Sequence, residues 1–275
     1  MAVAQNLRAF ALGRLALAAP EALRRLAGAT DSAPDPEALD GPDGLLQRRR
    51  RFLTAYQDAA LADRHAALVA QVRQAESALG GQAAQGLALT RAVAHQYARL
   101  LAVKDEYEVA RLHLDSGFDA LLKQQFAQWD RIVHHLAPPL LSRPGPDGRP
   151  RKKAFGPWVR SAFRVLAGMK RLRGTALDVF GHTQERRLER QLARDYEALV
   201  REELLPALRP DNLNLAVRLA EVVQQVRGFG PVKLANLVTA RAQWKALLDA
   251  WHGRTPEPAP AKTPQARRVI PVRAG

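Results

Sequence analysis

The sequence predicts a mainly α-helical protein, and three observations lead to this fold class. Apolar residues recur at helical spacing along most of the chain, which places them on one face of successive helices. Glycine and proline stand between the periodic segments, where helices end. The alternation typical of a strand is short, at Ile132, His134 and Leu136. We therefore expect a multi-helix globular domain with one short β-hairpin near residues 130–158.

The N-terminal part is predicted to be a lead-in helix followed by a linker. Residues 1–24 alternate apolar side chains with Arg8 and Arg14, so they form an amphipathic helix that ends near Pro20 and differs from a signal peptide. Residues 25–44 are predicted to be a loop or linker, because 30-TDSAPDPEALDGPDG-44 is rich in proline, glycine and aspartate and has no apolar period.

A helical domain is predicted over residues 45–253. Its first two helices run from Leu46 to Leu79, before Gly80-Gly81, and from about Leu87 to Leu114. Asp115-Ser116 is suited to capping a further helix that carries Phe118, Leu122 and Phe126. The hairpin region follows.

The remaining helices of this domain have clearer boundaries. A helix is expected over Trp158–Leu172, then a glycine-punctuated connector over 173–183, and a helix that Thr183 caps and that ends near Leu205. Asp211 is expected to cap a helix that ends at Val226, and Pro231 to begin the last one, which ends near Trp251. Residues 254–275 have proline at short intervals and are predicted to be a disordered tail.

Composition limits the classes of function. The chain has no cysteine, which excludes disulfides and thiolate-ligated metal centres within it. No apolar run reaches the roughly 18 residues of a membrane span, so we expect a cytoplasmic protein without membrane contact. The net charge of +15, from 42 basic and 27 acidic residues, would attract polyanions or acidic proteins. Solvated helix faces explain the same charge equally simply.

Few residues are candidates for chemistry. In 104-KDEYEVARLHLD-115, Glu108 is flanked by apolar residues and is a candidate acid or base. The structural alternative is an ordinary ion pair, since Glu108 lies four residues from Lys104 and three from Arg111. Adjacent His134 and His135 point to opposite sides and do not predict a metal site.

The positive charge is concentrated around a proline-rich stretch. Between Arg143 and Arg173 there are ten basic residues and one acidic residue, Asp147. Within it, Arg149, Arg151, Lys152 and Lys153 form what we call the basic segment. It is a candidate site for binding an anion or an acidic partner, and a solvated structural loop is the alternative.

Six segments, taken in order, are 48-RRRRFLTAYQDAALADRHAALV-69, 99-RLLAVKDEYEVARLHLD-115, 135-HLAPPLL-141, 149-RPRKKAFGPW-158, 173-RGTALDVFGHTQERRLER-190 and 227-RGFGPVKLAN-236. Together they resemble the carboxy-terminal region of indolepyruvate ferredoxin oxidoreductases, the fused bacterial enzymes that act on aryl 2-oxo acids. The resemblance covers nearly the whole chain except residues 25–44 and the tail.

This resemblance implies a non-catalytic carboxy-terminal subunit or fragment that supports assembly or docking. In that family thiamine diphosphate and iron–sulfur clusters carry the chemistry, and we expect them on companion domains or a partner chain, with none in this chain. The resemblance carries no catalytic residue onto a position here. It implies thiamine- and cluster-containing domains as partners, and an acidic ferredoxin as a further candidate. The alternative is a basic helical protein that binds nucleic acid, although no helix-turn-helix or zinc-finger signature is present.

Overall fold

A computed structural model of the chain describes residues 2–19, 41–115, 117–126, 130–137, 151–228 and 231–256. The chain divides into two units, residues 1–45 and 46–275, and each is described by itself. Helix α1 (Ala2–Ala18) belongs to the first unit and confirms the predicted lead-in helix. Residues 20–24 of the predicted lead-in helix, residues 25–40 of the predicted linker and residues 257–275 of the predicted tail lie outside the described residues.

From residue 41 onward, helices dominate the described part of the chain and confirm the predicted fold class. In chain order the elements are α4 (Pro42–Tyr56), α5 (Ala59–Ala78), α6 (Gly81–Gly86), α7 (Ala88–Leu101), α8 (Glu106–Asp115), α9 (Phe118–Gln125), β1 (His134–Leu136), β2 (Lys153–Phe155), α10 (Val159–Gly168), the 3-10 helix η1 (Met169–Leu172), α11 (Gln184–Ala198), the π-helix η2 (Leu199–Leu204), α12 (Leu213–Glu221), the 3-10 helix η3 (Val222–Gln225) and α13 (Pro231–Trp251).

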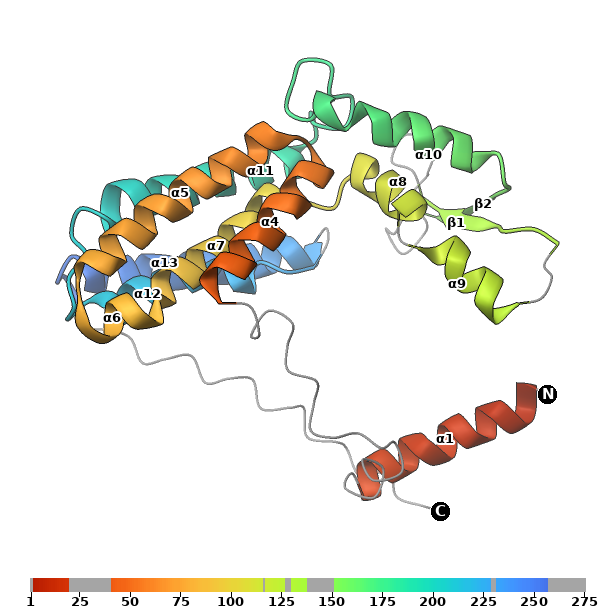
Figure 1. Cartoon of the computed structure of the whole chain (residues 1–275), viewed down its shortest axis with the longest axis horizontal. Helices are drawn as coiled ribbons and strands as arrows, with labels where there is room; N and C mark the ends of the chain where they lie inside the picture. The colour runs from red at the N-terminus through yellow and green to blue at the C-terminus, as the bar shows by residue number, and fades with distance from the viewer. Residues whose placement is uncertain are drawn as a thin grey trace. The chain divides into compact units, whose positions relative to one another are not determined.

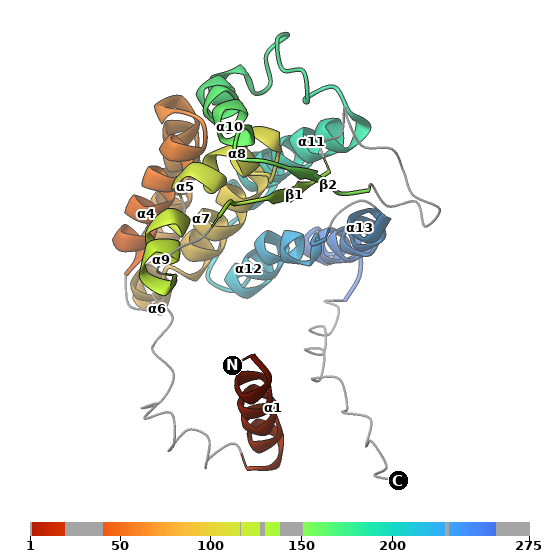
Figure 2. The same cartoon turned by 90° about the vertical axis from the view of Figure 1, so that its right-hand side faces the viewer.

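The second unit contains two groups of packed elements (Figure 1). In the first, α7 packs against α5, α11 and α12, and α13 packs against α12 and η3. In the second, α8 packs against α10, and the antiparallel hairpin of β1 and β2 lies beside them in both views (Figures 1 and 2). The register of this hairpin pairs His134 with Phe155 and Leu136 with Lys153. The predicted hairpin is therefore present.

Helix α7 is the centre of the first group because it is buried on more than one side. Small alanines alternate with larger apolar residues along it, so three helices can approach closely. A row of rings crosses the bundle at this level: His65 stacks on Tyr97, Tyr97 stacks on Tyr196, and Tyr196 contacts Trp244. These rings come from four helices and bury a large apolar area along one line.

The N-terminus of α7 is capped by a side chain from a neighbouring helix. Leu87, which precedes α7, has a left-handed backbone with φ of 47° and makes no side-chain cap. Instead the buried carboxylate of Glu76, on α5, accepts hydrogen bonds from Leu89 N (2.9 Å), Thr90 N (2.8 Å) and Thr90 Oγ1 (2.6 Å). A negative side chain at this position satisfies free backbone donors and complements the helix dipole. Glu76 therefore couples α5 to α7.

Two predicted long helices are each broken in the structure, and polar side chains explain both breaks. The helix expected over Leu46–Leu79 is divided into α4 and α5, because Asp58 accepts a hydrogen bond from Leu61 N and begins a new helix. The helix expected over Leu87–Leu114 is divided into α7 and α8, because Asp105 accepts one from Glu108 N. Apolar periodicity continues through both breaks and could not reveal them. The linker prediction is also wrong at its end, since α4 begins at Pro42.

Other boundaries were predicted closely. Thr183 caps α11 by accepting a hydrogen bond from Arg186 N, and Pro231 begins α13. The cap of α12 is corrected by one residue: Asn212 precedes the helix, and its side chain accepts from Arg209 N and donates to Ala207 O, so it shapes the preceding turn. None of the helices in the described ranges is both long and apolar enough to cross a membrane.

Replacing Glu76 tests the cap that joins α5 to α7. We expect Glu76→Ala to lower the free energy of unfolding by about 3 kcal/mol, since it leaves buried donors without an acceptor. Glu76→Gln should lower it less, because the amide oxygen keeps one acceptor. Urea denaturation measures both, with the exposed Glu202→Ala as the control. Equal stability of wild type and Glu76→Ala would show that solvent satisfies these donors.

Candidate functional site

A buried ion pair lies where the two groups of helices meet. Asp105 stands in the connection between α7 and α8, and Arg173 directly follows η1. The guanidinium donates to the carboxylate twice, from Nε to Oδ2 (2.5 Å) and from Nη2 to Oδ1 (2.8 Å). Each of the two side chains is only 7% exposed. This bidentate geometry is the strongest form of the arginine–carboxylate interaction.

Two tyrosines enclose this pair. The guanidinium carbon of Arg173 lies 3.8 Å from the ring centroid of Tyr56 and 5.3 Å from that of Tyr107. Arg173 also donates to the backbone oxygen of Tyr56 at the end of α4. Three segments far apart in the sequence are therefore held by one guanidinium. Its contacts with the ring faces add cation–π attraction in a poorly hydrated place.

Asp178 adds a second buried carboxylate from the connector between η1 and α11. It accepts hydrogen bonds from Gly174 N (2.8 Å), Phe180 N (3.3 Å) and the hydroxyl of Tyr107 (3.2 Å). A Cβ at Gly181 would lie 2.3 Å from its Oδ2, so only glycine fits there. We call Tyr56, Asp105, Tyr107, Arg173 and Asp178 the charged network.

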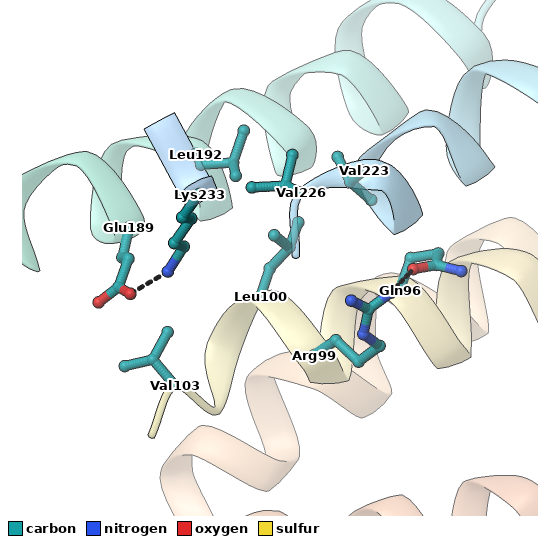
Figure 3. Close-up of a pocket in the computed structure, with 9 residues that line it drawn as sticks. All are labelled: Gln96, Arg99, Leu100, Val103, Glu189, Leu192, Val223, Val226 and Lys233. Carbon is teal, nitrogen blue, oxygen red and sulfur yellow. Dashed lines mark hydrogen bonds and ion pairs between the residues drawn. The ribbon is translucent and has the colours of Figure 1, made fainter. Parts of the chain in front are cut away.

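Further ion pairs flank the charged network. Glu108 accepts two hydrogen bonds from Arg111, at 2.8 and 2.7 Å. Glu189, on α11, accepts from Arg186 (2.7 Å) and is also bound by Lys233 on α13, as Figure 3 shows for the second contact. Each of these carboxylates is thus already matched by a cation.

The electrostatics keep the two phenols protonated. Burial raises the pKa of Tyr56 above its usual range, and the neighbouring Asp105 carboxylate raises it further. Burial and the Asp178 carboxylate raise the pKa of Tyr107 to about 12. Burial lowers the pKa of Arg173, but the hydrogen bonds to Asp105 and the nearby negative charges of Asp105 and Glu108 together outweigh it, and the pKa is raised overall. Both tyrosines therefore act as neutral hydrogen-bond donors near pH 7.

The open side of the charged network is a cavity of about 260 Å³. Five arginines line it with three carboxylates, and these residues are Arg64, Arg173, Arg186, Arg190, Arg194, Asp105, Asp178 and Glu189. Arg64 is paired with Glu197, to which it donates at 2.6 Å. An arrangement of fixed ion pairs with surplus guanidinium groups is suited to holding an anionic group in place.

The candidate acid or base predicted from the sequence lies in an environment typical of a structural ion pair. Glu108 is buried on α8, and its ion pair with Arg111 has the spacing of three residues that the sequence indicated. His134 is buried in β1 while His135 is exposed, so the two rings point to opposite sides as expected. No group of three or more histidine, aspartate or glutamate side chains that could hold a metal ion is found among the described residues.

The basic segment is only partly described. Arg151, Lys152 and Lys153 are exposed, and Lys153 begins β2. Arg149 lies outside the described residues, as does the rest of 138–150. The segment therefore presents three cations to solvent at one end of the hairpin.

Sequence reasoning on single residues missed Asp178 and Arg186, and it counted Arg173 only as one of the basic residues in the stretch that begins at Arg143. These residues lie within the segments that resemble the carboxy-terminal region of indolepyruvate ferredoxin oxidoreductases. Four of these segments contribute a residue to this region. Tyr56 comes from 48–69, Asp105 from 99–115, Arg173 from 173–190 and Lys233 from 227–236. Tertiary structure brings together residues that the sequence shows only as separate blocks.

Comparisons with known proteins give a family match. A model described as "Family of unknown function (DUF6537)" matches residues 43–246. No curated protein and no solved structure matches the chain.

Breaking the central ion pair tests the charged network. We expect Arg173→Met to lower the free energy of unfolding by about 3–5 kcal/mol, because it leaves a buried carboxylate without a cation. The double variant Arg173→Met/Asp105→Asn should lose less than the sum of the two single variants. Urea denaturation of the four proteins measures this coupling. Additive losses would contradict a direct pair.

Two histidines, the buried His65 and the half-buried His113, predict a loss of stability in mild acid. Burial lowers the pKa of His65, and burial and His134 lower that of His113, whose ring stacks on Phe163 at 4.8 Å. The folded state thus binds protons less readily than the unfolded state, whose histidine pKa is about 6.5. The free energy of unfolding should have its full value above that pH, and it should decrease as the pH drops toward the lowered pKa values of the folded state. The fall in melting temperature should be shallower in His113→Phe, and an identical pH profile would contradict this role of His113.

Proposed function

We propose that this chain, which belongs to the DUF6537 family of unknown function, is a non-catalytic accessory module of an indolepyruvate-type 2-oxoacid:ferredoxin oxidoreductase. In this proposal it supports assembly or docking of a larger enzyme. Thiamine diphosphate and iron–sulfur clusters belong to companion domains or a partner chain.

One observation carries the proposal. Four of the six segments that resemble the carboxy-terminal region of those enzymes converge on the charged network and its flanking ion pairs. The network is buried, and its hydrogen bonds link connections that are far apart in the sequence. Segments that carry the resemblance thus build one three-dimensional unit, which supports a shared fold and a shared role.

The chemistry of the network supports a structural and recognition role. Asp105 and Glu108 each accept hydrogen bonds from an arginine, and Glu189 from an arginine and a lysine. A general acid or base must gain and lose a proton during turnover, and an opposite charge at hydrogen-bond distance opposes that exchange. The paired side chains are instead suited to holding the helices in a fixed arrangement.

The basic segment supports docking to an acidic protein face. Arg151, Lys152 and Lys153 are exposed next to each other at the hairpin. Exposed charge clusters of this kind raise the rate of association with an oppositely charged partner. In the proposed enzyme, that partner is an acidic face of the companion chain or an acidic ferredoxin.

Co-purification from the native host tests the function. The tagged chain should carry with it a polypeptide that contains thiamine diphosphate, detected as thiochrome fluorescence, and iron–sulfur clusters, detected by visible absorbance. The complex should reduce an electron acceptor with indolepyruvate as substrate, and the chain alone should not. Turnover by the purified chain alone would overturn the proposal. Recovery of nucleic acid, with duplex DNA binding that weakens steeply with salt, would favour the alternative.

The same complex tests docking by the basic segment. Arg151→Glu/Lys152→Glu/Lys153→Glu should slow association with the purified partner and flatten its salt dependence while leaving the melting temperature unchanged. The matched control is Arg91→Glu/Lys123→Glu/Arg241→Glu. It reverses the same number of exposed charges, but on helices α7, α9 and α13 instead of at the hairpin. Equal effects of the two variants would show that only net charge matters.

A further inference from the structure

A groove of about 440 Å³ shares Arg186 and Glu189 with the cavity beside the charged network and contains an excess of positive charge. Four parts of the fold supply its cations: α4, the region of α7 and its C-terminal end, α11, and the segment from Arg227 to α13. The charged residues that line it are Arg49, Arg99, Lys104, Arg186, Arg227, Lys233, Glu185 and Glu189. We call this the basic groove.

The carboxylates of the basic groove do not balance its cations. Six cations face two carboxylates, so the lining has a formal excess of four positive charges. Glu189 is already shared by Arg186 and Lys233. Arg99 donates to the side-chain oxygen of Gln96 (2.8 Å), and Arg227 donates to the backbone oxygen of Gln224 (2.9 Å). These acceptors are neutral, so neither hydrogen bond cancels a charge.

The arginines are close enough to repel each other. Burial lowers the pKa of Arg99, and the charges of Arg227 and Arg49 lower it further. Folding holds these like charges together although their repulsion opposes it. A bound anion would remove that repulsion, so the arrangement gains most from a ligand with several negative charges.

The region next to the cations of the basic groove is apolar. An adjoining pocket of about 60 Å³ is lined by Leu100, Val103, Leu192, Val223 and Val226, and it shares Arg99 and Lys233 with the groove. Figure 3 shows Leu100 between Arg99 on one side and the Lys233–Glu189 pair on the other. An anion bound in the basic groove would therefore lie beside an apolar wall.

We propose that the basic groove binds a phosphate-bearing small molecule of the pyrophosphate or nucleotide class. Guanidinium groups bind phosphate oxygens through pairs of parallel hydrogen bonds. A monocarboxylate accepts the same kind of hydrogen bond but carries less negative charge than a pyrophosphate. The volume of the groove lies within the range of about 300–1,000 Å³ found for small-molecule sites. This site is independent of the proposed docking function, because it involves neither the basic segment nor a protein partner.

Isothermal titration calorimetry of the full chain with inorganic pyrophosphate and with ADP tests the site. We expect saturable binding to the wild type. Arg99→Gln/Arg227→Gln should weaken it about tenfold or more, since each arginine supplies a charge-assisted hydrogen bond. Arg91→Gln/Arg241→Gln removes the same formal charge from exposed positions outside the groove and outside the basic segment, and it should bind as the wild type does.

Three results would overturn the site. The first is no saturable binding of either phosphate ligand to the wild type. The second is an equal loss of affinity in the groove variant and the matched control, which would indicate attraction by net charge alone. The third is binding of citrate as tightly as pyrophosphate, which would exclude recognition of phosphate. If the double variant fails to fold, Arg99→Lys decides: it keeps the charge but loses the guanidinium geometry, so its affinity should fall, and unchanged affinity would overturn the site.

Discussion

The ion pair between Arg173 and Asp105 is the interaction on which the arrangement of the second unit depends. Its partners are 68 residues apart and lie in two connections that join the bundle around α7 to the group of α8, α10 and the hairpin. Burying two charges is unfavourable unless hydrogen bonds satisfy them. Here Arg173 donates a further hydrogen bond to the backbone oxygen of Tyr56, and Asp105 accepts one from the backbone amide of Glu108, so both buried charges have additional partners. The two connections are therefore held in one geometry.

The ends of helices in the bundle show the same dependence on polar contacts between segments. Glu76 caps α7 from α5, and Asp178 organises the connector from Gly174 to Gly181 while it accepts from Tyr107. Apolar packing around α7 contributes most of the burial but is not directional. The carboxylates add direction, since each accepts hydrogen bonds from specific backbone amides. Packing and polar contacts together produce a rigid platform for the two grooves.

The two grooves differ in how far their charges are balanced. On the side of Arg173, Asp105 binds Arg173 directly and Glu189 binds Arg186 directly. On the side of Arg99, cations are in larger excess and some of their hydrogen bonds go to neutral oxygens. The lining around Arg173 has a formal excess of two positive charges and the lining around Arg99 an excess of four, so the second gains more free energy when an anion enters. This difference separates the region that we consider structural from the one that we propose to bind phosphate.

The sequence by itself determined most of the helices, because apolar periodicity and caps such as Thr183 and Pro231 act over a few residues. It also indicated the short hairpin and the spacing of the Glu108–Arg111 pair. It did not reveal the breaks at Asp58 and Asp105, since apolar spacing continues through both. Only the tertiary structure decided that Arg173 meets Asp105 and that Arg49, Arg99 and Arg227 share one groove. Such pairings depend on the directions in which distant segments leave their helices, and short-range patterns carry no information about those directions.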